Sequence, residues 1–185
     1  MPESVTAAEV VGCIRELHRA RQGTLLIAVD GLGGAGKTTL ARKIAAEVGD
    51  VTVVCLDDFA RPTALGWEQD RFVEQVLQPV LNGRPGRYQR WDWDADAPAE
   101  WHEVPTNGVL VVEGVSSTRR EIGHPWDLTI WVSAPFAVRL RRGVERDGEP
   151  MRSVWTGRWM PEEDAYLMQQ RPDERADLIV DGTAG

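Results

Sequence analysis

The chain has 185 residues, of which 42% are hydrophobic, 27% are charged and 18 are glycines, values typical of a single soluble globular domain. Its 29 acidic and 21 basic residues give a net charge of −8, and a negative field of this size disfavours binding to nucleic acid and to anionic membranes. The two cysteines, Cys13 and Cys55, are too few for a disulfide framework or a cysteine-based zinc site.

The first 20 residues have neither the basic start nor the apolar block of a signal peptide. The longest apolar run is also much shorter than the about 20 residues that a membrane-spanning helix needs. We therefore expect one domain over residues 1–185, located in the cytoplasm, with no nucleic-acid or membrane partner. The sequence leaves the oligomeric state open.

Helical and extended patterns alternate in the first half of the chain. Thr6, followed by Glu9 three residues later, forms a capping box, which is a common start of a helix. Short apolar runs rich in valine and isoleucine are typical of buried parallel strands. Helices are expected over residues 6–21, 37–48 and 67–82, and strands over 25–30 and 51–56.

The second half continues the alternation after an irregular stretch, residues 83–107, which is expected to form a loop or hairpin on the substrate side. Glu162, Glu163 and Asp164 follow Pro161, where the positive end of a helix dipole favours acids. This order of elements predicts an α/β fold with a mostly parallel, five-stranded sheet and helices on both faces. The remaining strands are expected over 108–115, 127–134 and 176–182, and the remaining helices over 135–146 and from 161.

A glycine-rich loop, GLGGAGKT at 31–38, lies between the first of these apolar strands and the helix that follows it. It matches G-x-x-x-x-G-K-[ST], in which backbone N–H groups surround a phosphate. Lys37 should reach the β- and γ-phosphates, and the Thr38 hydroxyl should bind Mg²⁺. The loop predicts a three-layer P-loop fold that binds ATP with Mg²⁺, although the preference for ATP over GTP stays open. The expected nucleotide-binding residues are Gly31, Gly33, Gly34, Ala35, Gly36, Lys37, Thr38 and Thr39.

Two large classes of nucleotide-binding protein lack support in the sequence. Neither Asn82 nor Asn107 begins the N-K-x-D segment with which a GTPase would read its base, and there is no L-S-G-G-Q signature of a transporter ATPase. A small phosphoryl-transfer enzyme remains.

Acidic residues follow three of the predicted strands: Asp30, the pair Asp57-Asp58, and Glu113. Ligands of open α/β sheets bind beyond these strand ends, and a kinase needs one acid to accept a hydroxyl proton and another near Mg²⁺. Either Asp57 or Asp58 is therefore the candidate base, and Glu113 is the candidate for the metal. The alternative is that strand-end acids cap helices or pair with arginines.

Four segments together resemble the uridine and cytidine kinases and their relatives, which include pantothenate kinase and phosphoribulokinase. They are GLGGAGKTTLA, LDDF, VVEG and RLRRGVERD, and the resemblance runs from about residue 25 to 181. It implies that Asp57 is the general base, close to the metal, and that Glu113 lies near Mg²⁺.

The resemblance also implies an arginine-rich lid over 135–160. Within it, Arg139 is a substrate candidate, and Arg142 and Arg146 are catalytic candidates with Lys37. Arginines above the phosphates would stabilise the charge that develops on the transferred group. The alternative is a solvated helix face whose arginines pair with nearby acids.

The stretch NGRPGRYQRWDW resembles the one before a substrate-binding hairpin in the same family. Trp91, Trp93 and Trp101 lie among Asp92, Asp94 and Asp96, so the indole rings could stack on a flat acceptor and the acids could bind its hydroxyls. Burial of the rings as loop anchors is equally compatible with the sequence. The further substrate candidates are Asp58, Tyr88, Trp91, Asp92 and His102.

The sequence thus predicts an ATP-dependent kinase that transfers the γ-phosphate to a hydroxyl of a small molecule. The resemblance makes uridine or cytidine the leading acceptor. Two alternatives stay open: a kinase for another small alcohol, pantothenate-like or sugar-like, and a regulatory protein that hydrolyses ATP slowly.

Overall fold

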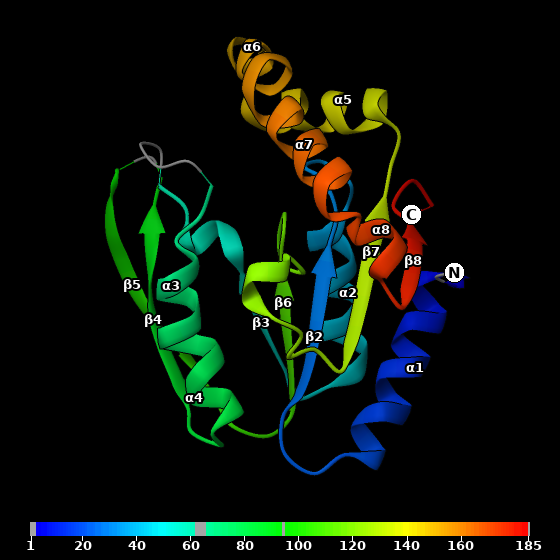
Figure 1. Ribbon diagram of the computed structural model, residues 1–185, viewed down its shortest axis with the longest axis vertical. Coiled ribbons are helices and arrows are strands. Elements are labelled where there is room, and N and C mark those ends of the chain that lie inside the picture. The colour runs from blue at the N-terminus through cyan, green and yellow to red at the C-terminus, as the bar shows by residue number, and fades with distance from the viewer. Residues whose placement is uncertain (1–2, 62–65, 94, 185) are drawn as a thin grey trace.

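The computed structural model describes residues 3–61, 66–93 and 95–184. It is a three-layer α/β structure built on a parallel sheet with the strand order β1-β8-β7-β2-β6-β3 (Figure 1). The strands of this sheet are β1 (Glu3–Val5), β2 (Leu25–Asp30), β3 (Val51–Cys55), β6 (Val109–Glu113), β7 (Leu128–Ser133) and β8 (Leu178–Asp181).

The central strand β2 is buried along its whole length because both faces of the sheet are covered. Since successive side chains of a strand point to opposite faces, Ile27 and Val29 join one core, and Leu26 and Ala28 join the other. Helices α1 (Ala7–Ala20) and α2 (Lys37–Val48) cover the first face. Helices α3 (Gln69–Phe72) and α4 (Gln78–Leu81) cover the second.

The prediction of five strands is wrong by one, because the described chain has a sixth parallel strand, β1, paired with β8. This strand is three residues long and its only apolar residue is Val5, so it has no hydrophobic pattern. It forms because β8 has unpaired backbone N–H and C=O groups along its outer side. These groups are in place to pair with β1 only once the sheet has folded.

The predicted helix over 67–82 is present, although it is not uniform. A π-helical turn, Val73–Leu77, joins α3 to α4, and it comes directly before a segment that contains Pro79. Proline lacks the N–H that a regular helix would use, and π turns are a recognised irregularity in such helices. At the chain start the capping box of Thr6 and Glu9 is confirmed, with both reciprocal hydrogen bonds present.

Residues 83–107 form an antiparallel hairpin of β4 (Gly86–Asp92) and β5 (Ala97–Val104). The hairpin lies beside the α3–α4 helix, separate from the main sheet (Figure 1). Its register places Tyr88 opposite His102 and shifts between Gln89 and Trp91.

The segment 136–170, which we call the cap, lies beyond the carboxyl ends of the parallel strands (Figure 1). It consists of α5 (Phe136–Asp147), a turn at Glu149–Met151, α6 (Arg152–Val154), a π-helical turn at Trp155–Trp159, and α7 (Met160–Gln170). The short helix α8 (Pro172–Arg175) then leads into β8. Within the described ranges, no helix has the length and hydropathy to cross a membrane.

Candidate active site

The glycine loop connects the carboxyl end of β2 to the start of α2. It lies at the end of the sheet that the cap covers (Figure 1). Gly36 precedes α2 in a left-handed conformation, with φ of 109°, which a residue with a Cβ rarely adopts. At Gly34 an added Cβ would lie 2.5 Å from the Arg139 carbonyl oxygen. The loop therefore needs these glycines both for its turn and for its close approach to the cap.

Lys37 is largely buried, with 8% of its surface exposed, and its Nζ donates to the Leu32 carbonyl oxygen at 3.1 Å. The ammonium group is thus folded back over the loop that it follows. An ammonium beside a helix N-terminus and several loop N–H groups makes a site for an anion such as a phosphate.

Thr38 and Glu113 are brought together because β2 and β6 are neighbours in the sheet. The Thr38 hydroxyl donates to Glu113 Oε1 at 2.8 Å, and Glu113 is 3% exposed. Their oxygen atoms fit Mg²⁺, which takes oxygen ligands and is commonly completed by water and substrate phosphates. Among the described residues, no group of three His, Cys, Asp or Glu side chains is arranged to hold a metal ion.

Asp57 and Asp58 lie in the turn Leu56–Phe59 after β3, in different surroundings. The Asp58 carboxylate accepts a hydrogen bond from the Tyr88 hydroxyl at 2.8 Å, and burial raises the pKa of Asp58. Asp57 is exposed, and within the described ranges its carboxylate accepts no hydrogen bond. Asp58 therefore ties the hairpin to the sheet, while the carboxylate of Asp57 is available.

Asp30, the third acid at a strand end, holds neighbouring segments together. It is 1% exposed and accepts hydrogen bonds from the backbone N–H of Gly31 at 2.7 Å and from the Tyr166 hydroxyl at 2.7 Å. Three more come from Ser116 and Thr118, at 2.6 to 2.9 Å. Asp30 thus joins the glycine loop, the loop after β6 and the cap. Its role is structural, but its partners among the described residues are loop N–H groups and hydroxyls, and not the helix cap or arginine expected from the alternative.

The three expected lid arginines all lie on α5, but they contact protein groups. Arg139 is 4% exposed and pairs with Glu163 at 3.3 Å and Asp164 at 3.6 Å. Arg142 Nη1 donates to three carbonyl oxygens, those of Gly34, Ala35 and Gly182, at 3.0 to 3.4 Å.

Arg146 is bound by Asp147 through two hydrogen bonds, at 2.7 and 3.0 Å. Its pKa is raised, mainly by Asp147 and in part by the charge of Asp57. This cap arginine therefore lies within electrostatic reach of the exposed acid.

The hairpin carries the other substrate candidates. The Tyr88 and His102 rings stack with centroids 5.1 Å apart, and His102 Nε2 lies 3.2 Å from Glu100. Trp91 donates its indole N–H to Asp96, and the Arg61 guanidinium lies 4.1 Å above its ring. Tyr88, His102 and Trp91 thus have partners inside the protein.

The hairpin tip is shaped by Asp92, whose carboxylate accepts from the Ala95 N–H at 2.9 Å and from Arg90 at 3.2 Å. Trp93 is 42% exposed and donates to the Asp57 carbonyl oxygen at 3.3 Å. Trp93 thus connects the hairpin to the turn Leu56–Phe59, which carries Asp57 and Asp58 and which we call the acid turn. Asp94 lies outside the described residues.

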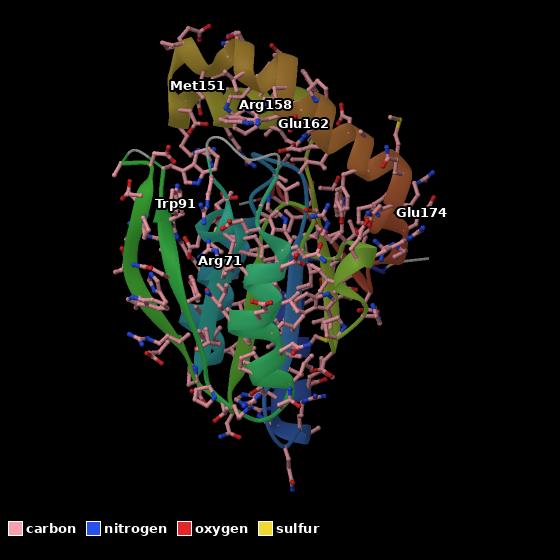
Figure 2. The ribbon with its side chains drawn as sticks, turned by 60° about the vertical axis from the view of Figure 1, so that its left-hand side comes forward. Arg71, Trp91, Met151, Arg158, Glu162 and Glu174 are labelled. Carbon is pink, nitrogen blue, oxygen red and sulfur yellow. The ribbon has the colours of Figure 1, made fainter. Side chains whose placement is uncertain are left out.

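Three residues that the sequence did not single out for the site contribute to it. Arg71 of α3 donates to the carbonyl oxygens of Asp58, at 3.0 Å, and Gln89, at 2.6 Å, and so joins the acid turn to the hairpin. Figure 2 shows Arg71 below Trp91 and facing the hairpin. Trp155, 2% exposed, packs against Gly143 and the Gly33 side of the loop.

The third residue is Glu163, which the sequence placed only as an acid in the first turn of a helix. Its Oε2 accepts the backbone N–H of Gly33 at 2.9 Å. No local pattern could have indicated this contact, since 130 positions separate the two residues.

Comparison with known proteins gives sequence relatives of low identity. The chain is 28% identical over 141 residues to a uridine kinase of Halobacterium salinarum. It is 23% identical over 155 residues to uridine-cytidine kinase C of Dictyostelium discoideum. The Halobacterium match covers 65% of this chain and 61% of that relative. The Dictyostelium match covers 75% of this chain but only 34% of that relative. No protein-family model matches the chain.

Solved structures agree over nearly the whole chain. A provisionally assigned uridine kinase from Bacillus stearothermophilus superposes with a TM-score of 0.71, covering 94% of this chain and 98% of that one at 20% identity. A provisionally assigned fructose transport system kinase from a Silicibacter species has a TM-score of 0.66, covering 95% and 98% at 22% identity. The chain has the P-loop kinase fold, and in sequence and structure it is similar to the uridine kinase-like family of P-loop kinases.

Proposed function

We propose that this protein is an ATP-dependent kinase that transfers the γ-phosphate of ATP to a hydroxyl of a small-molecule acceptor. The observation that carries the proposal is the meeting of the Lys37 loop, the Thr38–Glu113 pair and the exposed Asp57 at the carboxyl ends of adjacent strands. This is the edge at which open α/β sheets bind ligands.

In this proposal the loop residues Gly31, Gly33, Gly34, Ala35, Gly36, Lys37, Thr38 and Thr39 hold the nucleotide phosphates. The oxygens of Thr38, Glu113 and Asp57 would hold the metal, either directly or through water. Bound Mg²⁺ would neutralise charge on the phosphates. In this proposal Lys37 supplies a fixed positive charge, and Arg142 and Arg146 would leave their protein partners to stabilise the charge that develops on the transferred phosphate.

Asp57 is proposed as the base that accepts the proton of the acceptor hydroxyl. Asp57 is exposed, and its carboxylate accepts no hydrogen bond from the residues that the structure describes. Both observations support this role, because a base must reach the substrate and keep a lone pair open. Asp58 is less suited, since its carboxylate already accepts the Tyr88 hydroxyl.

The acceptor would lie between the acid turn and the hairpin, where Trp93 reaches the Asp57 carbonyl oxygen. Uridine and cytidine are the first acceptors to consider, because the two sequence relatives carry those names. A sugar-like alcohol is the second candidate, favoured by the resemblance to the fructose transport system kinase. In either case the acceptor site would draw on the hairpin residues Tyr88, Trp91, Asp92 and His102, whereas Arg139 lies against the glycine loop.

The test is ATP consumption by the purified protein with Mg²⁺, in the presence of nucleosides, sugars and pantothenate-like alcohols. Each active mixture is checked by mass spectrometry for the gain of one phosphate. Turnover that depends on an acceptor, and is lost in Asp57→Asn while ATP still binds, supports the kinase. Turnover that is independent of every acceptor and unaffected by Asp57→Asn would instead indicate a regulatory ATPase.

A further inference from the structure

A carboxylate of the cap lies directly on the glycine loop. Glu163 Oε2 accepts the Gly33 N–H at 2.9 Å, and Oε1 would lie 2.6 Å from a Cβ built on Gly33. Its side chain is only 12% exposed. The carboxylate therefore covers the backbone of the glycine loop at Gly33.

The surroundings of Glu163 are those of an anion site. Lys37 of α2 and Arg139 of α5 both attract its negative charge, and the neighbouring Asp164 opposes it. Burial is nevertheless the largest effect and raises the pKa of Glu163. P-loops bind phosphate with backbone N–H groups of the loop and with the loop lysine. Here the Glu163 carboxylate accepts one such N–H, that of Gly33, and is attracted by the charge of Lys37, whose Nζ donates to the Leu32 carbonyl oxygen.

We propose that Glu163 fills the phosphate site while the loop holds no nucleotide, and that the phosphates of the nucleotide displace it. This inference rests on the proposed nucleotide binding at the loop. Two anions cannot share one N–H and one ammonium without strong repulsion. On displacement Arg139 loses one of its two carboxylate partners, so its guanidinium becomes available to the phosphates.

The cap does not depend on Glu163 for its attachment. Tyr166, one turn further along α7, donates to Asp30 at 2.7 Å, and Trp155 is buried against Gly143. The side chain of Glu163 can therefore leave the loop while α7 stays docked. In consequence, removing its charge should alter nucleotide affinity more than folding.

The test compares MgATP binding by calorimetry in the wild type, Glu163→Gln and Glu162→Gln. Glu162 is the matched control, because it is the adjacent residue on α7, is about half exposed and pairs with Arg158, which is labelled near it in Figure 2. We expect Glu163→Gln to bind MgATP about tenfold more tightly, which corresponds to a change of about 1.4 kcal/mol in the binding free energy. Glu162→Gln should stay within about twofold of the wild type.

A second variant, Glu163→Asp, keeps the charge but has a side chain one methylene shorter, which weakens the hydrogen bond from the Gly33 N–H. Its MgATP affinity should therefore rise above that of the wild type, by a smaller factor than in Glu163→Gln. Melting curves establish that each variant is folded. If the wild type binds MgATP and neither Glu163 variant binds it more tightly, the inference is overturned while the proposed function stands. If the wild type and all variants fail to bind, the proposed function is overturned together with the inference.

Discussion

Thr38 and Glu113 are 75 positions apart in the chain, yet the hydroxyl of one donates to the carboxylate of the other at 2.8 Å. The contact follows from the parallel pairing of β2 with β6, which brings Val29 level with Glu113. Because the glycine loop starts at the end of β2, the same pairing sets this carboxylate beside the loop. Two oxygen groups are thus positioned beside the glycine loop, at the proposed nucleotide site.

Replacing Glu113 with glutamine should raise the Mg²⁺ concentration needed for half-maximal turnover by about 10- to 100-fold. The reason is that a carboxylate beside the phosphate loop is lost while the shape of the side chain is kept. Turnover measured across a Mg²⁺ titration tests this. Glu103→Gln is the control, because Glu103 is an exposed hairpin residue paired with Arg87. Equal Mg²⁺ requirements in both variants would contradict a metal role for Glu113.

Asp57→Asn and Asp58→Asn should affect different properties. Loss of a general base at Asp57 should lower kcat by about 10²- to 10⁴-fold with little change in melting temperature. Asp58→Asn weakens the hydrogen bond with Tyr88, so it should lower the melting temperature and change kcat less. Steady-state kinetics and thermal melts of both proteins check this. The opposite pattern would make Asp58 the base.

The hydrogen bonds that converge on Asp30 should make it one of the most sensitive positions for stability. Asp30→Ala leaves buried donors without a partner and should lower the free energy of unfolding by about 3 kcal/mol or more. Tyr166→Phe removes only one of these donors and should cost about 1 kcal/mol. Urea denaturation of both variants measures the difference. A loss in Asp30→Ala no larger than in Tyr166→Phe would show that the other donors find new partners.

The raised pKa of Glu163 predicts a specific dependence of stability on pH. Burial is the largest effect, and together with the repulsion of Asp164 it makes the folded state bind this proton more tightly than the unfolded state does. The attraction of Lys37 and Arg139 acts in the opposite direction. The stabilising contribution of the protonated form is complete below the ordinary glutamate pKa of about 4.3 and is lost as pH rises through the raised value.

The stability of the wild type relative to Glu163→Gln should therefore fall as pH rises from that ordinary value through the raised one. Urea denaturation of both proteins at a series of pH values measures this difference. A difference that is independent of pH, or that grows in favour of the wild type, would contradict it.

The sequence by itself determined the parts of this protein that depend on neighbouring residues. The strand at 25–30, the glycine loop and the helix from Lys37 to Val48 lie where the patterns predict them, because a strand pattern, a loop conformation and a helix start are each set within a few residues. The alternation of these elements also predicts the parallel sheet. The edge strand at Glu3–Val5 was missed because its formation depends on a partner strand.

Only the tertiary structure decided which side chains meet. Asp57 and Asp58 are adjacent in sequence and chemically identical, and they differ because the hairpin places the Tyr88 hydroxyl on one of them. The helix predicted to begin at Pro161 instead continues a helical run that starts at Arg152. Within it, the docking of α7 puts Glu163 on Gly33. Such contacts join segments far apart in the chain, and their geometry depends on how the hairpin and the cap pack on the sheet, which no local pattern records.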